Sequence, residues 1–181
     1  MKVKMLKASL AGLVLSVSGF ANAGLIPFGI HTNTSATTVT DTWGWNECFS
    51  TSGTSEVSIN TVLAGCSGDN LMMATRIAGT DNLLILAAAS FSTVTAQTSY
   101  LYNQQSTNSE NGVDWYSNGY SWGFTDVGNL VRQSSADVNL HSSLENNIGM
   151  SWHTSWTDTT QSWQQDSSKA MGAIRNGWAY N

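Results

Sequence analysis

The stretch from Val113 to Phe124, VDWYSNGYSWGF, decides the fold expected for this chain. It places Asn118-Gly119, the preferred two-residue turn of a tight β-hairpin, between two segments in which large apolar and polar residues alternate. A turn there pairs Ser117 with Tyr120 and Trp115 with Trp122. The stretch therefore predicts a β-hairpin with a cross-strand tryptophan pair.

Alternation along this hairpin separates its side chains between two faces. One face is expected to hold Val113, Trp115, Tyr120, Trp122 and Phe124, and the other Asp114, Tyr116 and Ser121. A tryptophan pair on one face of a hairpin has two readings, a place in the hydrophobic core or a flat surface for a ligand. The core reading is the better one, because indole rings bury a large apolar area.

Other segments rich in Thr, aromatic and β-branched residues also predict strands, with turns at Gly, Asn and Asp. Leu83–Ala89 can be read as a helix, but its length and the turn before it favour a strand. Polar loops are expected at 133–147 and 157–169. The other expected strands are 37–40, 43–49, 71–77, 83–89, 90–102, 148–156 and 171–180.

One short helix is expected near 55–64. Ser55 can cap it, and Gly65 can end it. Many short strands with a single helix indicate an all-β protein, a β-sandwich of jelly-roll-like type. The length suits a single domain, expected to span residues 24–181.

Residues 1–23 carry the pattern of a signal peptide. Lys2, Lys4 and Lys7 precede an apolar core at 10–20, and Ala21-Asn22-Ala23 is a small-residue cleavage signature. The protein is therefore expected to be secreted, to the extracellular space or to the periplasm of a Gram-negative bacterium. No later segment has the roughly 18 apolar residues of a membrane helix, so it is not expected to be an integral membrane protein.

Without the signal peptide the chain is more acidic. Lys2, Lys4 and Lys7 are three of the seven basic residues, so four remain against 12 acidic residues, a formal net charge of −8. Such a chain is a poor partner for nucleic acid or anionic lipid. Ser, Thr, Asn and Gln supply the polar surface instead, and their neutral hydrogen-bonding groups suit a glycan.

Cys48 and Cys66 are the two cysteines. In an exported protein they are expected to form a disulfide, the alternatives being free thiols or a two-cysteine metal site. No histidine stands at a zinc-like spacing from either, so no metal site is expected there. Asp69 and Asn70 could ligate calcium, but the loop lacks the spaced ligands of an EF-hand.

Several strings of the sequence carry a likeness to other proteins. They are GIHTN at 29–33 leading to Val39-Thr40, GWNEC at 44–48, LAGCSGDNLM at 63–72, YSWGF at 120–124 and SWHT at 151–154. With them the chain resembles an uncharacterised family of secreted bacterial β-rich domains with no established activity. The resemblance implies a secreted domain and supplies no catalytic residue. The end of the chain departs from the family's usual Gly-Trp-Arg-x-Gly, keeping only Arg175 and Gly177 of it.

Catalytic chemistry finds little support. A general base needs a nearby carboxylate or nucleophile, and spacing identifies none for His31, His141 or His153. Asp41 with Glu47, or Asp158 with Asp166, could meet as a carboxylate pair, although surface solvation is the simpler reading. Nucleophile-elbow and phosphate-loop motifs are absent from the sequence. An enzyme is therefore not the favoured reading, and no cofactor is expected.

The tryptophans, eight in a chain with 10% charged residues, are the best functional lead. Trp163 stands in a polar segment, either tucked over the edge of the core or offered to a ligand. Trp156, Gln164 and Asp166 are the neighbours expected to share a ligand site with it. Trp43 and Trp45 are expected to share one face in the core.

These observations favour a secreted, non-catalytic binding module for a neutral glycan or another cell-surface polymer. The first alternative is a structural component of an extracellular matrix or surface assembly, which would bring self-assembly. The second alternative is a secreted hydrolase.

Overall fold

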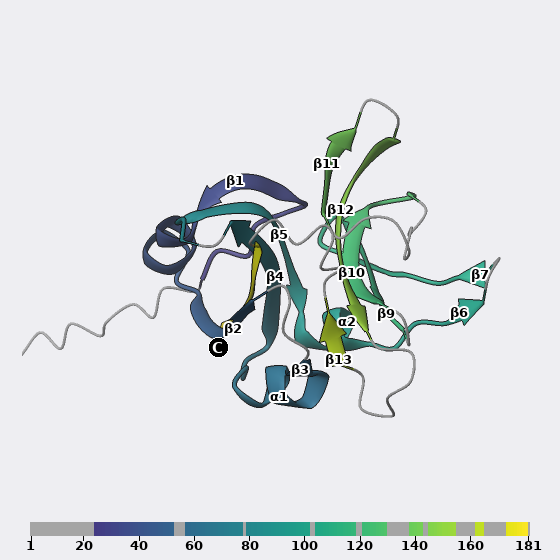
Figure 1. Ribbon diagram of the computed structural model, residues 1–181, viewed down its shortest axis with the longest axis horizontal. Coiled ribbons are helices and arrows are strands. Elements are labelled where there is room, and N and C mark those ends of the chain that lie inside the picture. Colours follow the sequence, from purple (N-terminus) through teal and green to yellow (C-terminus); the bar gives the residue numbers. More distant parts are fainter. Residues whose placement is uncertain are drawn as a thin grey trace, which may run out of the picture.

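The computed structural model describes residues 24–52, 57–77, 79–101, 104–118, 121–129, 138–142, 145–154, 162–164 and 173–180. Two antiparallel sheets lie against each other (Figure 1), so the expected all-β sandwich is confirmed. Sheet A has the strand order β1-β5-β4-β14-β2. Its strands are β1 (His31–Ser35), β5 (Asn82–Ser90), β4 (Asn70–Ile77), β14 (Ala173–Tyr180) and β2 (Asn46–Ser52).

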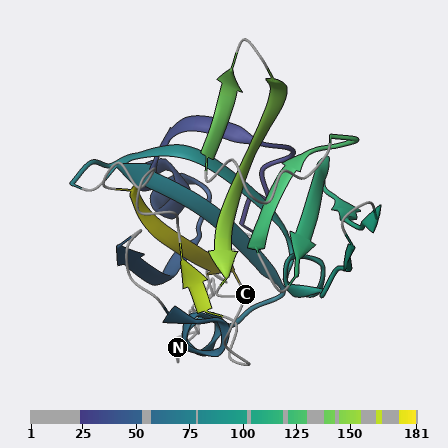
Figure 2. The ribbon, with the colours of Figure 1, turned by 45° about the vertical axis from the view of Figure 1, so that its right-hand side comes forward.

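Sheet B has the order β3-β13-β12-β10-β9-β8, with β11 paired to β12 beside this path. A small hairpin, β6 (Tyr100–Leu101) with β7 (Gln104–Gln105), lies apart from both sheets in Figures 1 and 2. The strands of sheet B are β3 (Val57–Ser58), β13 (Ser162–Gln164), β12 (Glu145–Thr154), β10 (Ser121–Asp126), β9 (Val113–Ser117), β8 (Asn108–Glu110) and β11 (Val138–Ser142).

The main core fills the space between the sheets. Aliphatic side chains of β4 and β5 meet aromatic side chains of sheet B there, which removes both from water. Helix α2 (Phe91–Thr95) adds Val94 to this core, and Trp122 donates its indole N–H to the Val94 carbonyl. The principal contributors are Leu71, Met73, Ile85, Ala87, Trp115, Trp122, Phe124, Met150 and Trp152.

A second, smaller core covers the other face of sheet A. It is capped by the connection between β1 and β2, which contains the π-helical turn η1 (Thr38–Thr42). Val39 and Trp45 from this connection are buried against sheet A, with Trp43 packed partly beside them. The sheet-A residues beneath are Met72, Ala74, Leu83, Leu86 and Ala88.

The pairing of β5 with β4 contains an irregularity that decides which of the two cores a β5 side chain enters. Thr75 pairs with Ile85, but the next β4 residue, Arg76, pairs with Leu83. This β-bulge moves Leu83 to the face of Leu86, although simple alternation would group it with Ile85.

The hairpin of β9 and β10 is confirmed, but its predicted register is wrong by two residues. Ser117 pairs with Trp122, and Trp115 pairs with Phe124. A shift of two preserves alternation, so Val113, Trp115, Trp122 and Phe124 share the core face as expected. Trp122 instead pairs with Trp152 of β12, their ring centroids 5.4 Å apart.

Other boundaries also differ from expectation. Residues 38–40 belong to η1 rather than to a strand, and Thr37 is its N-cap. Residues 90–102 begin with α2, because Ser90 caps a helix by accepting from the Thr93 N–H. The expected loop 133–147 contains β11 and the start of β12. Helix α1 is Ile59–Ala64, shorter than expected, since 57–58 pair with β13. Strands β4, β5 and β14 fall where predicted.

Candidate functional site

The four residues predicted to bind a ligand fall partly outside the described residues. Trp156 and Asp166 lie outside them. Trp163 and Gln164 belong to β13, so the prediction of a loop there is wrong: Trp163 pairs with Thr154 and with Val57, and Gln164 pairs with His153. The backbone ladder holds Trp163 on both sides and Gln164 on the β12 side. Their role in binding stays a prediction.

The tryptophans whose side chains are described serve the two cores. Trp45, Trp115, Trp122 and Trp152 are buried, as expected for Trp45 and for the hairpin pair. Trp43 is half-buried and meets the His31 ring edge-on, with centroids 5.5 Å apart. These five tryptophans pack in or beside the cores, so an exposed aromatic ring among the described side chains has to be sought elsewhere.

Phe28 is that ring. Its side chain is 75% exposed, and it is the aromatic member of the exposed large hydrophobic residues in the described part of the chain. Leu25 and Ile26, which precede it, are also exposed. We call residues 24–30 the N-terminal segment, and Phe28 is its most exposed large apolar residue.

The backbone of the N-terminal segment is fixed by hydrogen bonds, while Leu25, Ile26 and Phe28 stay exposed. The Leu25 N–H donates to the Trp43 carbonyl, 3.1 Å away, and the Trp45 indole donates to the Leu25 carbonyl at 2.9 Å. Nearer the ring, the Gly29 N–H donates to the Asn111 carbonyl at 2.9 Å. An exposed ring on an anchored backbone is preorganised for contact, because little ordering entropy remains to be lost on binding.

The surface beneath Phe28 is the turn between β8 and β9. Glu110 pairs with Val113, so Asn111-Gly112 forms a two-residue hairpin turn, and φ is 54° at Asn111 and 75° at Gly112. Both angles are those of the type I′ turn that Asn-Gly prefers. A Cβ on Gly112 would lie 2.7 Å from the ring of Phe28, so the glycine leaves room for the ring.

Sequence reasoning missed this turn, although the same Asn-Gly signal was available. It was applied to Asn118-Gly119, where the ladder closes only at Ser117 and Trp122. The overlooked pair, Asn111-Gly112, is followed by the same alternating strand. The signal could therefore have found the tight turn, though not its contact with Phe28.

The turn between β8 and β9 also supplies hydrogen-bond partners to backbone groups of β5, at the edge that β1 does not cover. Strand β1 pairs with residues 82–86 and stops there. Beyond that point, Asn111 donates through Nδ2 to the Ala88 carbonyl at 2.9 Å, and Glu110 accepts the Ser90 N–H at 3.0 Å. Side chains from sheet B thus satisfy backbone groups that β1 leaves open in sheet A.

Glu110 is the titratable group of this region with a shifted pKa. Burial raises its pKa, but hydrogen bonds outweigh burial: the Ser90 and Thr93 hydroxyls and the Ser90 N–H together hold the pKa below its usual value. The Ser90 hydroxyl donates to the carboxylate at 2.6 Å. The ionised form is therefore favoured.

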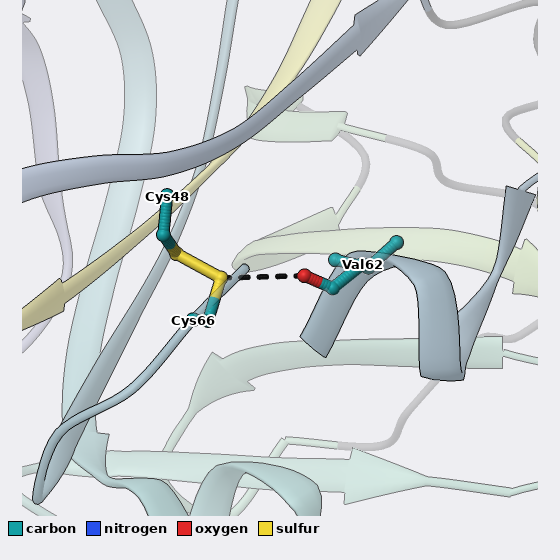
Figure 3. Close-up of a disulfide and its surroundings, with 3 residues drawn as sticks. All are labelled: Cys48, Val62 and Cys66. Carbon is teal, nitrogen blue, oxygen red and sulfur yellow. Dashed lines mark hydrogen bonds between the residues drawn. A yellow bond between two sulfur atoms is a disulfide. The ribbon is translucent and has the colours of Figure 1, made fainter. Parts of the chain in front are cut away.

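The disulfide between Cys48 and Cys66 is confirmed (Figure 3). It joins β2 to the segment after α1, with the two Cα atoms 5.0 Å apart. The Cys66 sulfur also lies 3.4 Å from the Val62 carbonyl oxygen, a packing contact because a disulfide sulfur has no hydrogen to donate. Gly65 lets the chain pass this close, since a Cβ there would meet the Cys48 carbonyl at 2.7 Å. The bond is compatible with an oxidising extracellular or periplasmic environment.

Sheet B turns a polar face away from the core. Asp114, Thr125 and Ser151 lie on it and are buried. Asp114 accepts from Ser109 and from the Gly128 N–H, and Thr125 donates to the Ile148 carbonyl. The Ser151 hydroxyl has no hydrogen-bond partner within the part of the chain that the structure describes.

Catalytic and metal chemistry receive no support from the described residues. They contain no group of three or more His, Cys, Asp or Glu side chains that could hold a metal ion. Glu47 faces Arg76 at 3.9 Å. The proposed calcium loop is used structurally, since Asn70 begins β4 and the Asp69 carbonyl accepts the Phe91 N–H. No helix among the described residues is long and apolar enough to cross a membrane.

Comparison with known proteins returns no match: no family model, no curated protein and no solved structure is similar to this chain. The geometry of its own residues therefore has to carry the functional argument.

Proposed function

We propose that the protein is a secreted, non-catalytic binding module for a neutral glycan or another cell-surface polymer, with Phe28 as a stacking surface. The observation that carries this proposal is an aromatic ring 75% exposed on a backbone fixed at Leu25 and Gly29. Exposing a phenylalanine in this way leaves apolar area in water, which a ligand with an apolar face would cover.

The sequence around Phe28 suits a neutral ligand. Residues 24–40 contain no Asp, Glu, Lys or Arg, whereas residues 41–181 are net acidic. Sugar rings combine an apolar C–H face with hydroxyls that need neutral donors and acceptors. The Thr residues of β1, which directly follows the N-terminal segment, supply such groups.

A second candidate function is a structural component of an extracellular assembly. Leu25 and Ile26 favour it, because they add exposed aliphatic area beside the ring, 55% and 39% exposed. Aliphatic side chains fit a protein surface better than a sugar. In that case a second copy of the chain would cover the N-terminal segment.

Binding of the exported protein to insoluble neutral polysaccharides tests the proposal. A suitable panel contains a β-1,4-glucan, a β-1,4-linked N-acetylglucosamine polymer and an α-1,4-glucan. We expect retention on at least one of them, and about tenfold weaker retention for Phe28→Ala, which corresponds to the loss of roughly 1.4 kcal/mol of contact. Phe28→Tyr keeps a ring and should keep binding.

Two controls separate binding from folding and from self-assembly. Val127→Ala removes another exposed apolar side chain and should leave retention unchanged. Light scattering of the wild type and of Phe28→Ala reports the oligomeric state. Absence of retention on every polymer would overturn the proposal, and an oligomer that Phe28→Ala dissociates would establish the assembly function in its place.

A further inference from the structure

We infer that Asn111 is the positioning residue of this site: its side-chain amide clasps the N-terminal segment and so holds the Phe28 ring in place. The consequence for ligand binding rests on the function proposed above. The clasp itself can be measured without any ligand.

Asn111 contacts the chain on both sides of Phe28. Its Nδ2 donates to the Pro27 carbonyl at 2.6 Å, and its main-chain carbonyl accepts the Gly29 N–H at 2.9 Å. The same Nδ2 donates to the Ala88 carbonyl of β5 at 2.9 Å. A primary amide has two N–H groups, so both are used, and one residue joins the N-terminal segment to both sheets.

Burial of the Phe28 ring is too small to fix its position. A residue that stays 75% exposed gains little from burial, so the place of Phe28 depends on its flanking residues. Pro27 is buried, and Ile30 packs partly against the main core. The His31 ring nitrogen, 3.1 Å from the Phe28 carbonyl, adds one exposed contact. Asn111 supplies the nearest hydrogen bonds from outside residues 24–31.

Two demands select asparagine at this position. Its φ of 54° lies in the left-handed region, which Asn, Asp and Gly tolerate best. The contacts with Pro27 and Ala88 require a donor directed at two carbonyl oxygens. Aspartate meets the first demand and fails the second, because an ionised carboxylate only accepts.

Asn111→Asp in the full exported chain is therefore the decisive variant. A carboxylate facing the Pro27 and Ala88 carbonyls should release the N-terminal segment. We expect about tenfold faster hydrogen exchange at the Gly29 amide, as for a locally opened segment, and faster cleavage after Phe28 by a protease that selects aromatic residues. Retention on the polysaccharide bound by the wild type should fall about as far as in Phe28→Ala.

Asn33→Asp is the matched control. Asn33 also has a left-handed backbone, with φ of 53°, but its Oδ1 accepts from Asn82 Nδ2. Aspartate can replace that acceptor, so this variant should leave both exchange at Gly29 and polysaccharide retention unchanged.

A recovery at low pH separates a missing donor from general damage. Below about pH 4 the carboxyl introduced by Asn111→Asp gains a proton and can donate again, so exchange at Gly29 should slow towards the wild-type rate. The titratable groups beside the clasp are Glu110 on the same turn and His31 after the N-terminal segment. Residues 24–30 and 82–90 of β5 add none. Wild-type protein measured at each pH corrects for both.

The outcomes keep the two claims apart. Unchanged exchange at Gly29 in Asn111→Asp would overturn the inference, whatever the polysaccharide result. Faster exchange with undiminished retention would overturn it as well, because the ring would then need no positioning. If the wild type binds none of the polymers, the proposed function fails, while exchange and its recovery at low pH still decide whether Asn111 is the clasp.

Discussion

Sheet A and sheet B bury their faces differently. Sheet A carries apolar side chains on both faces, one packed on sheet B and the other covered by η1 and the connection around it. Sheet B is apolar towards the core and polar on the other face, where Asp114, Thr125 and Ser151 lie. The sequences show why: β5 reads NLLILAAAS without alternation, whereas β9 reads VDWYS with it.

This difference locates the region left for function. Sheet A is enclosed, and the polar side chains described on sheet B largely bond to their neighbours. The exposed aromatic ring lies where the sheets meet, at the turn that supplies Glu110 and Asn111 to the open edge of β5. The candidate site is thus a junction between the sheets rather than a face of either one.

The largest loss of stability is expected for a substitution on the outer face of sheet A, the face turned away from sheet B. Met72 there is fully buried against Val39 and Trp45. Met72→Ala should lower the free energy of unfolding by about 2–5 kcal/mol, because it removes buried apolar area and leaves a cavity. Urea unfolding followed by tryptophan fluorescence measures it.

The matched change on the outer face of sheet B is Ser151→Ala. Ser151 is as buried as Met72, but its hydroxyl has no partner among the described residues. Removing an unsatisfied polar group costs little, so its unfolding free energy should stay within about 0.5 kcal/mol of the wild type or rise. A cost as large as that of Met72→Ala would show that the outer faces do not differ as described.

The disulfide should have the next largest effect. It closes a loop of sequence separation 18 between the edge strand β2 of sheet A and the segment after α1. Replacing both cysteines with alanine should lower stability by about 3 kcal/mol, through the freedom regained by the unfolded chain. The same measurement on reduced wild-type protein is the control, and equal stability of oxidised and reduced forms would contradict the prediction.

Local sequence patterns predicted where strands of this fold lie, but not their register or which residues pair between them. Alternation and apolar runs found β4, β5, β9 and β10, because each sits in a core that needs those side chains. Strand β14 also lies where its sequence predicts it. The hairpin register failed because pairing of Trp122 with Trp152 depends on β12, far away in the sequence. The bulge that moves Leu83 is set by pairing with β4 and leaves no local signal.

The candidate site was harder to predict than the fold. The expectation that exposed aromatic area marks function came from the abundance of tryptophan, but the described tryptophans fill the cores. Phe28 stands in an ordinary apolar stretch directly after the expected signal peptide, and it lies on a turn whose Asn111 is 84 residues away from Pro27. Sequence reasoning can name the Asn-Gly turn, but it cannot show which segment lies on it.

The smallest loss of stability is expected for a substitution of Glu110, which links the two sheets. Because the pKa of Glu110 is lowered in the folded protein, its contribution to stability is present above the ordinary carboxyl pKa and is lost as pH falls through the folded-state value. Glu110→Gln should therefore cost stability near neutral pH and progressively less in acid.

Ser90→Ala removes the hydroxyl that donates to the carboxylate and should reduce the same pH dependence. Urea midpoints from pH 7 to pH 3 for both single variants and the double variant measure the coupling. Additive losses would mean that the carboxylate and the hydroxyl stabilise the junction independently, whereas coupled losses would mark the Glu110–Ser90 contact as a bond that joins sheet B to the edge of sheet A, beside the contact of Asn111 with Ala88.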